Sequence, residues 1–168
     1  MSHSGVVPGL FAGNFAVEIS TNLTTWTAVS NATVKVDDVE QSRPSGEAFV
    51  GGSSDYATLT IGKQEPVEIT LTFLYSEIPG SAMNIFLNQF QSSTPRIAVR
   101  WSPRGLIGGV HAYSTSNDGG ATAGRGVITS FTLGALDPSD PEPYIAIATI
   151  RTPSLRQYFL GTNPTDLS

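Results

Sequence analysis

Residue types that carry out chemistry are sparse in this sequence and widely separated along it. The chain has 2 histidines, His3 and His111, and neither belongs to a motif that ties it to a serine, aspartate or glutamate. It has 0 cysteines, which excludes thiol catalysis, zinc–thiolate sites and a disulfide framework. The sequence therefore predicts no nucleophile, and we expect a protein that is not an enzyme and uses no cofactor.

The carboxylates form no recognisable catalytic or metal-binding set. Glu68 and Glu77 are conceivable as a glycosidase pair, but nothing in the sequence places them on opposite sides of a sugar cleft. Asp37, Asp38 and Glu40 lack the spacing of a cation-binding loop, and we interpret them as the solvated end of a strand. No metal site is predicted.

Two tryptophans offer the remaining chemistry, because aromatic rings can stack on sugars. Trp26 and Trp101 are the features that support a carbohydrate-binding β-sandwich module as an alternative interpretation. Tryptophan side chains are on average well buried in folded proteins. We therefore expect both rings to belong to the fold.

An alternating pattern of apolar and polar residues at 66–73 predicts a half-buried strand. One face of this strand carries Val67, Ile69, Leu71 and Phe73, and the other carries Glu68, Thr70 and Thr72. Pro66 suits the first position of a strand, where a missing N–H costs little. We expect the apolar face to lie in the core and the polar face to be solvated.

A change of period after this strand predicts one short helix at about residues 81–91, with Ser81 as its N-cap. Apolar residues recur at i, i+3, i+4 and i+7, in the order Met83, Phe86, Leu87 and Phe90. We expect this stripe to pack on the core, with Phe86 and Phe90 buried against the preceding strand.

Further alternating segments bring the expected total to about eight strands. They include residues 15–21, 32–39, 96–101, 127–133 and 144–150. The predicted fold is mainly β, a barrel or sandwich with one short packed α-helix. A length of 168 residues suits a single domain over residues 1–168.

Three segments are expected to lie outside this compact domain. Residues 1–12 are interpreted as an N-terminal arm, residues 40–55 as a long loop and residues 151–168 as a C-terminal arm. The loop is longer than most connections in compact domains. Phe49 and Val50 are apolar within this otherwise polar loop, which suits a contact with another chain.

Short patterns between residues 62 and 115 point to a family. They are Gly62-Lys63-Gln64-Glu65-Pro66, the strand ending Tyr75-Ser76-Glu77, the short helix, Arg100-Trp101-Ser102-Pro103 and Tyr113-Ser114-Thr115. Together they resemble the major tail tube protein of long-tailed (siphovirus-type) bacteriophages. The resemblance implies a subunit of hexameric rings that stack into a hollow tube, together with other tail proteins. In this family a long loop reaches the adjacent ring, which implies that role for Phe49 and Val50. The resemblance also implies assembly in the host cytoplasm and a final location in the tail of the virion.

The composition agrees with a conduit that does not bind what passes through it. The net charge of −5 and the pI of about 4.8 argue against direct affinity for nucleic acid, which needs clustered Lys and Arg. The charged fraction of 14% is low, which fits either flanks that neighbouring subunits cover or simply an uncharged β-protein surface. The sequence shows neither a signal peptide nor a long apolar run, so no membrane association is predicted.

We therefore interpret the chain as a self-assembling tail tube subunit that forms a conduit for DNA ejection, through which DNA passes without specific binding. Glu68, Thr70 and Thr72 are expected to line the lumen, because acidic and hydroxyl groups adhere weakly to phosphates. A capsid decoration or head-completion protein is the nearest alternative, and the carbohydrate-binding module is the other.

Overall fold

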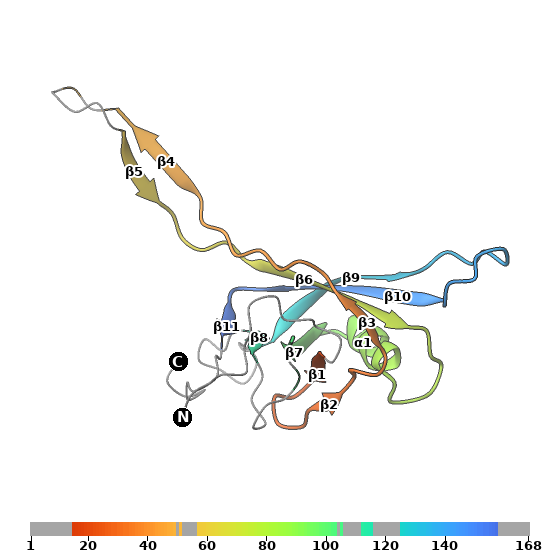
Figure 1. The fold of residues 1–168 in the computed structure, drawn as a ribbon. Helices are drawn as coiled ribbons and strands as arrows, with labels where there is room; N and C mark the ends of the chain where they lie inside the picture. The colour runs from red at the N-terminus through yellow and green to blue at the C-terminus, as the bar shows by residue number, and fades with distance from the viewer. Residues whose placement is uncertain are drawn as a thin grey trace, which may run out of the picture.

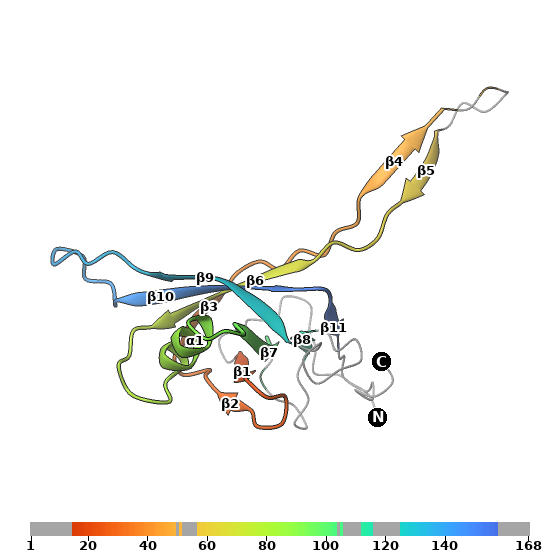
Figure 2. The same ribbon diagram turned by 180° about the vertical axis from the view of Figure 1, so that it is seen from behind.

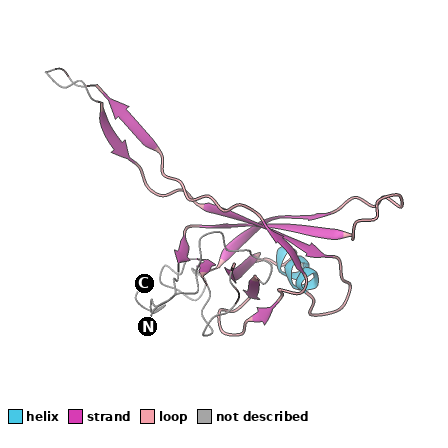
Figure 3. Ribbon diagram, in the orientation of Figure 1, coloured by secondary structure: helices cyan, strands magenta, loops and turns pink. Residues whose placement is uncertain are grey.

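The computed structural model describes residues 15–49, 51, 57–103, 105, 112–115 and 125–157. Within these residues the chain is mainly β, as predicted, with a single helix (Figure 3). The strands are β1 (Ala16–Ser20), β2 (Thr27–Ala28), β3 (Thr33–Val36), β4 (Ser45–Ala48), β5 (Thr58–Ile61), β6 (Val67–Leu74), β7 (Arg96–Ser102), β8 (Tyr113–Thr115), β9 (Gly126–Leu133), β10 (Ile145–Thr152) and β11 (Leu155–Gln157). The helix is α1 (Ala82–Phe90).

Nine of the strands form one curled antiparallel sheet with two layers. The upper layer in Figure 1 has the order β3, β6, β10, β9, and the lower layer has the order β2, β1, β7, β8, β11. Strand β7 joins the layers, because Ile97 pairs with β9 while Trp101 pairs with β8. The result is a barrel-like sandwich, which Figure 2 shows from behind.

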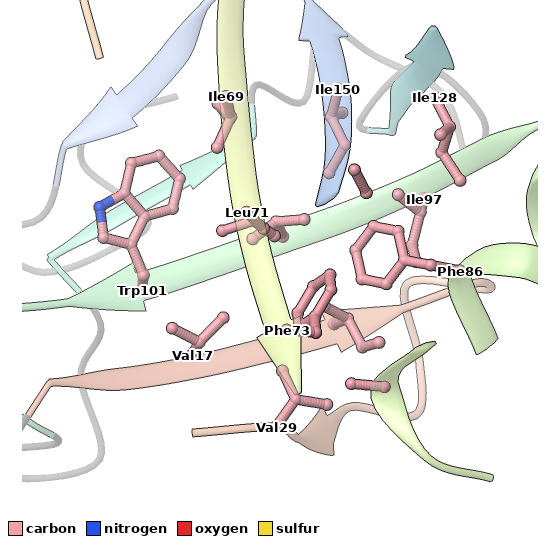
Figure 4. Packing of buried hydrophobic residues seen from close by; sticks show 14 residues of the cluster. Val17, Val29, Ile69, Leu71, Phe73, Phe86, Ile97, Trp101, Ile128 and Ile150 are labelled. Carbon is pink, nitrogen blue, oxygen red and sulfur yellow. The ribbon is translucent and has the colours of Figure 1, made fainter. Parts of the chain in front are cut away.

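The core lies between the two layers and follows directly from the alternation in β6. Val67, Ile69, Leu71 and Phe73 are buried, while Glu68 and Leu74 are exposed. In Figure 4, Ile69, Leu71 and Phe73 of β6 lie among buried side chains of β1, β7, β10 and α1. On β10 the inward positions include the small Ala146 and Ala148, which leave room for these large side chains.

The helix covers one end of the core and begins where the sequence predicts. Ser81 is the N-cap, and its Oγ accepts a hydrogen bond from the backbone N–H of Asn84 at 3.4 Å. Met83 and Phe86 are buried, Leu87 is half-buried, and the ring of Phe86 lies 4.8 Å from that of Phe73.

The expectation that Phe90 is buried is wrong. Phe90 is the last residue of α1 and is 37% exposed. Its ring stacks against Phe131 of β9 at 6.5 Å, at the edge of the sheet and outside the core. The apolar stripe of α1 thus extends about one turn beyond the part of the helix that covers the core.

The segment predicted as a loop at residues 40–55 contains a strand. Ser45–Ala48 forms β4 and pairs with β5 in an antiparallel register from Ser45↔Ile61 to Ala48↔Thr58. We call this β4–β5 hairpin the arm, and Figure 1 shows it projecting far beyond the sandwich. Phe49 lies just after β4, and Val50 lies outside the described residues.

The other predicted arms are only partly described. Strand β10 continues to Thr152, and β11 pairs with β8, so residues 151–152 and 155–157 belong to the main sheet. Residues 158–168 and the N-terminal segment 1–12 lie outside the described residues.

Candidate assembly surfaces

The upper layer has one buried face and one open face, and the open face carries the residues predicted to line a lumen. Glu68 is exposed, and Thr70 and Thr72 are half-buried, all directed away from the core. Across the register, Thr70 stands opposite Thr149 and Thr72 opposite Ile147. The hydroxyl groups of Thr70 and Thr149 lie 3.3 Å apart. Strands β6 and β10 thus share a hydroxyl-rich strip along the middle of this face.

The few charges on the open face occur next to opposite charges. Glu68 pairs in register with Arg151 of β10, which places the two charges on neighbouring strands. On β3, the Nζ of Lys35 lies 2.6 Å from Asp37 Oδ1. This hydrogen bond and the charge of Asp37 raise the pKa of Lys35, so the lysine stays protonated at any physiological pH. The face therefore presents little net charge of either sign.

The arm exposes large apolar side chains that an isolated subunit would leave in water. Phe49, Leu59 and Ile61 are 78%, 71% and 74% exposed. Two-stranded hairpins are marginally stable on their own in water, and exposed apolar groups of this kind mark sites of interaction. The arm is therefore a candidate surface for contact with another chain.

Hydrogen bonds at the base of the arm hold it as a continuation of the sheet. The N–H of Gly62 donates to the carbonyl of Pro44 at 2.7 Å, and the N–H of Glu65 donates to that of Ser42 at 2.9 Å. The Ser42 hydroxyl also donates to Glu65 Oε2 at 2.9 Å. The arm therefore leaves the sandwich as a paired ladder.

Neither tryptophan offers a free platform for a sugar ring. Trp101 is 7% exposed and stacks on Tyr113 at 5.5 Å. The guanidinium of Arg100 lies 4.0 Å from the centre of the Trp26 ring, and Arg100 is also ion-paired with Glu18. The contacts of both rings are structural, which disfavours the carbohydrate-binding alternative.

The described residues also offer no catalytic constellation. A pocket of about 490 Å³ is lined by Trp101, Tyr113, Leu155 and the strand β3. Asp37, the one carboxylate among its described lining residues, is ion-paired with Lys35. No group of three His, Asp or Glu residues in the described part of the chain is placed to hold a metal ion. In the same part, no helix is long and apolar enough to cross a membrane. His3 and His111 lie outside the described residues.

Known structures share this architecture across almost the whole chain. A chain from the anti-feeding prophage (AFP) baseplate, 6-fold symmetrised, superposes with a TM-score of 0.66 at 12% identity, covering 96% of this chain and 100% of its own. The sequence itself has no match among protein-family models or curated proteins. The chain shares its fold with this baseplate chain.

Chains from two other particles share the same fold. A chain from the sheath/tube terminator of an extracellular contractile injection system, PVC, has a TM-score of 0.60 at 14% identity, covering 92% of this chain and 97% of its own. A chain from the tail of an empty GTA particle with C6 symmetry has a TM-score of 0.54 at 9% identity, covering 86% and 96%. At such identities the likeness establishes the fold alone.

Proposed function

We propose that this chain is a structural subunit of a phage-like tail tube, which forms hexameric rings that stack into a hollow conduit. The observation that carries the proposal is the asymmetry of the upper layer. One face is sealed against the core, and the other is open, hydroxyl-rich and nearly neutral. An open face of this kind suits the wall of a channel through which a polymer must slide.

Rings form in this proposal when upper layers stand side by side around an axis with their open faces inward. Such closure covers the exposed edge of β3, because a closed barrel has no free strand edges. The hexameric number rests on the fold shared with chains of 6-fold and C6 symmetric particles. Such a subunit would serve equally in a siphovirus tail, a contractile tail or an injection system.

The arm supplies the contact between rings in the same proposal, and an armless variant tests it. The hydrogen-bonded positions Pro44 and Gly62 face each other, so residues 45–61 can be replaced by an Asn-Gly turn that closes the ladder. We expect the variant to fold and to form single rings in electron micrographs, because the sandwich keeps its core. Tubes of normal length from the armless variant would contradict a role for the arm in stacking.

A charge reversal tests the direction of the open face. Glu68→Lys changes an exposed strand position, which tolerates substitution within about 0.5 kcal/mol, so folding and assembly should persist. The substituted lysine would then stand opposite Arg151 and place two cations side by side in every subunit. The tube should therefore retain double-stranded DNA at low salt and release it at high salt. Asn88→Lys, on the exposed side of α1, is the control and should retain none.

A further inference from the structure

The hydrophobic core is covered at one end by α1 and opens at the other into the pocket of about 490 Å³. Figure 4 shows Phe86 of α1 and Trp101 of β7 on opposite sides of Leu71. The pocket lies between the two layers, because its lining comes from β3 with the segment after it and also from β7, β8 and β11. We call it the interlayer pocket.

The walls of the interlayer pocket are mainly apolar and continue the core. Its half-buried apolar residues pack against the buried cluster, and they are Phe15, Val36, Val39, Tyr113 and Leu155. The two charged residues among its described lining are Lys35 and Asp37, which form an ion pair at 2.6 Å. Burying an unpaired charge is costly, so the pocket suits an apolar segment without charged side chains.

The N-terminal segment of the chain has this composition. Residues 1–14 contain no Lys, Arg, Asp or Glu. Their large apolar side chains are Val6, Val7, Leu10 and Phe11. Removal of such side chains from water is favourable, so the segment and the pocket match in polarity.

Connectivity brings this segment to the interlayer pocket. Phe15 lines the pocket and directly follows the segment. Leu10 precedes Phe15 by five residues, and an extended chain spans at most about 3.6 Å per residue, so Leu10 can reach any point within about 18 Å of Phe15. Gly13 and Asn14 favour turns, which allows the chain to reverse direction just before Phe15.

The C-terminal segment is the other part of the chain that adjoins the pocket, and it is less suited. Leu155 lines the pocket, and the apolar Tyr158, Phe159 and Leu160 follow β11. No Gly, Pro, Asn, Asp or Ser stands between Leu155 and Leu160 to reverse the chain. A chain that continues in the direction of β11 along β8 leads away from Leu155.

We propose that residues 6–11 dock in the interlayer pocket of their own chain and complete the core at the end opposite α1. The N-terminal arm predicted at residues 1–12 thus folds back onto its own domain. It ties β3, the edge strand of the upper layer, to the lower layer. This inference goes beyond the proposed function, because it concerns a single subunit and holds whether or not rings form.

Cross-linking between paired cysteines tests the docking directly, because the chain contains 0 cysteines of its own. Leu10→Cys places a thiol on the segment, and Val34→Cys places one on the pocket wall, where the side chain is 50% exposed. In the control pair, Asn88→Cys on the exposed side of α1 replaces Val34→Cys. Each pair is treated with a short bis-maleimide at low protein concentration, and linked peptides from monomers are identified by mass spectrometry.

We expect a link between positions 10 and 34 within monomers and none between positions 10 and 88. Adding Phe11→Asp should lower the yield of the first link by about tenfold or more, because the docked segment would have to bury a carboxylate. An unchanged yield would show that the segment meets the pocket only by collision, and would overturn the proposal.

The same experiment identifies a different occupant if there is one. A link between Leu160→Cys and Val34→Cys, with none between positions 10 and 34, would assign the pocket to the C-terminal segment. A link between positions 10 and 34 found only in dimers would assign it to the N-terminal segment of a second copy. Absence of the link between positions 10 and 34 from monomers overturns the proposal in every case.

Discussion

Truncation of Phe86 tests how tightly the helix α1 packs on the core of the sandwich. The side chain is fully buried and contacts Phe73, with ring centres 4.8 Å apart. Complete burial of a phenylalanine contributes about 1.5–3 kcal/mol. The cavity left behind adds to this, so Phe86→Ala should lower the free energy of unfolding by about 3–5 kcal/mol.

Phe90→Ala is the matched control, because it removes the same atoms from the same helix. Phe90 is 37% exposed and stacks only at the edge of the sheet, so its truncation opens to solvent and leaves no closed cavity. We expect a loss of about 1–2 kcal/mol, below the range for a buried phenylalanine.

Urea denaturation followed by tryptophan fluorescence measures both losses, since Trp101 is buried in the sandwich. All samples need the same low protein concentration, because assembly stabilises the folded state by mass action. A loss below about 1 kcal/mol for Phe86→Ala, or one no larger than for Phe90→Ala, would refute the packing described here.

Two further substitutions probe the sheet and the β9–β10 turn. Gly126→Ala should destabilise the subunit by about 1–3 kcal/mol in the same assay, because a Cβ at this buried site would lie 2.3 Å from Cγ2 of Ile150; unchanged stability would contradict the register of β9 on β10. The hydroxyl and N–H of Ser139 lower the pKa of Asp137, so Ser139→Ala should raise this pKa part of the way towards its ordinary value in a carboxyl NMR titration. Because the pKa is lowered in the folded turn, the stabilisation is present above the ordinary carboxyl pKa and is lost as the pH falls through the lowered one.

Elements whose local pattern agrees with their burial are predictable from the sequence. In β6, apolar and polar residues alternate in the same order as buried and more exposed positions. The sequence alone therefore identifies Glu68, Thr70 and Thr72 as one solvated face. The helix is equally predictable, because Ser81 supplies the cap and Met83 and Phe86 supply the apolar stripe.

Elements held by non-local pairing are missed. Ser45-Gly46-Glu47-Ala48 has low strand propensity, and it is a strand only because its backbone pairs with β5. The alternation of Leu59 and Ile61 is typical of a half-buried strand, yet both side chains are exposed because no layer lies beneath the arm. Whether a layer lies beneath a strand depends on the tertiary structure, which the alternation of one strand does not reveal.

The neighbours of the predicted lumen residues also depend on tertiary structure. The sequence places Thr149 and Ile147 on one strand but does not say which of the other strands lies beside it. The register of β10 on β6 sets Thr149 opposite Thr70 and Arg151 opposite Glu68. These pairs, more than any single residue, make the open face hydroxyl-rich and nearly neutral.

Helical reconstruction by cryo-electron microscopy of concentrated wild-type protein tests the central claim most directly. We predict hollow tubes in which the open face of β3, β6, β10 and β9 lines the lumen, with Glu68 and Thr70 directed toward the axis. Monomers at every concentration, closed particles, or tubes whose lumen is lined by the lower layer would contradict it.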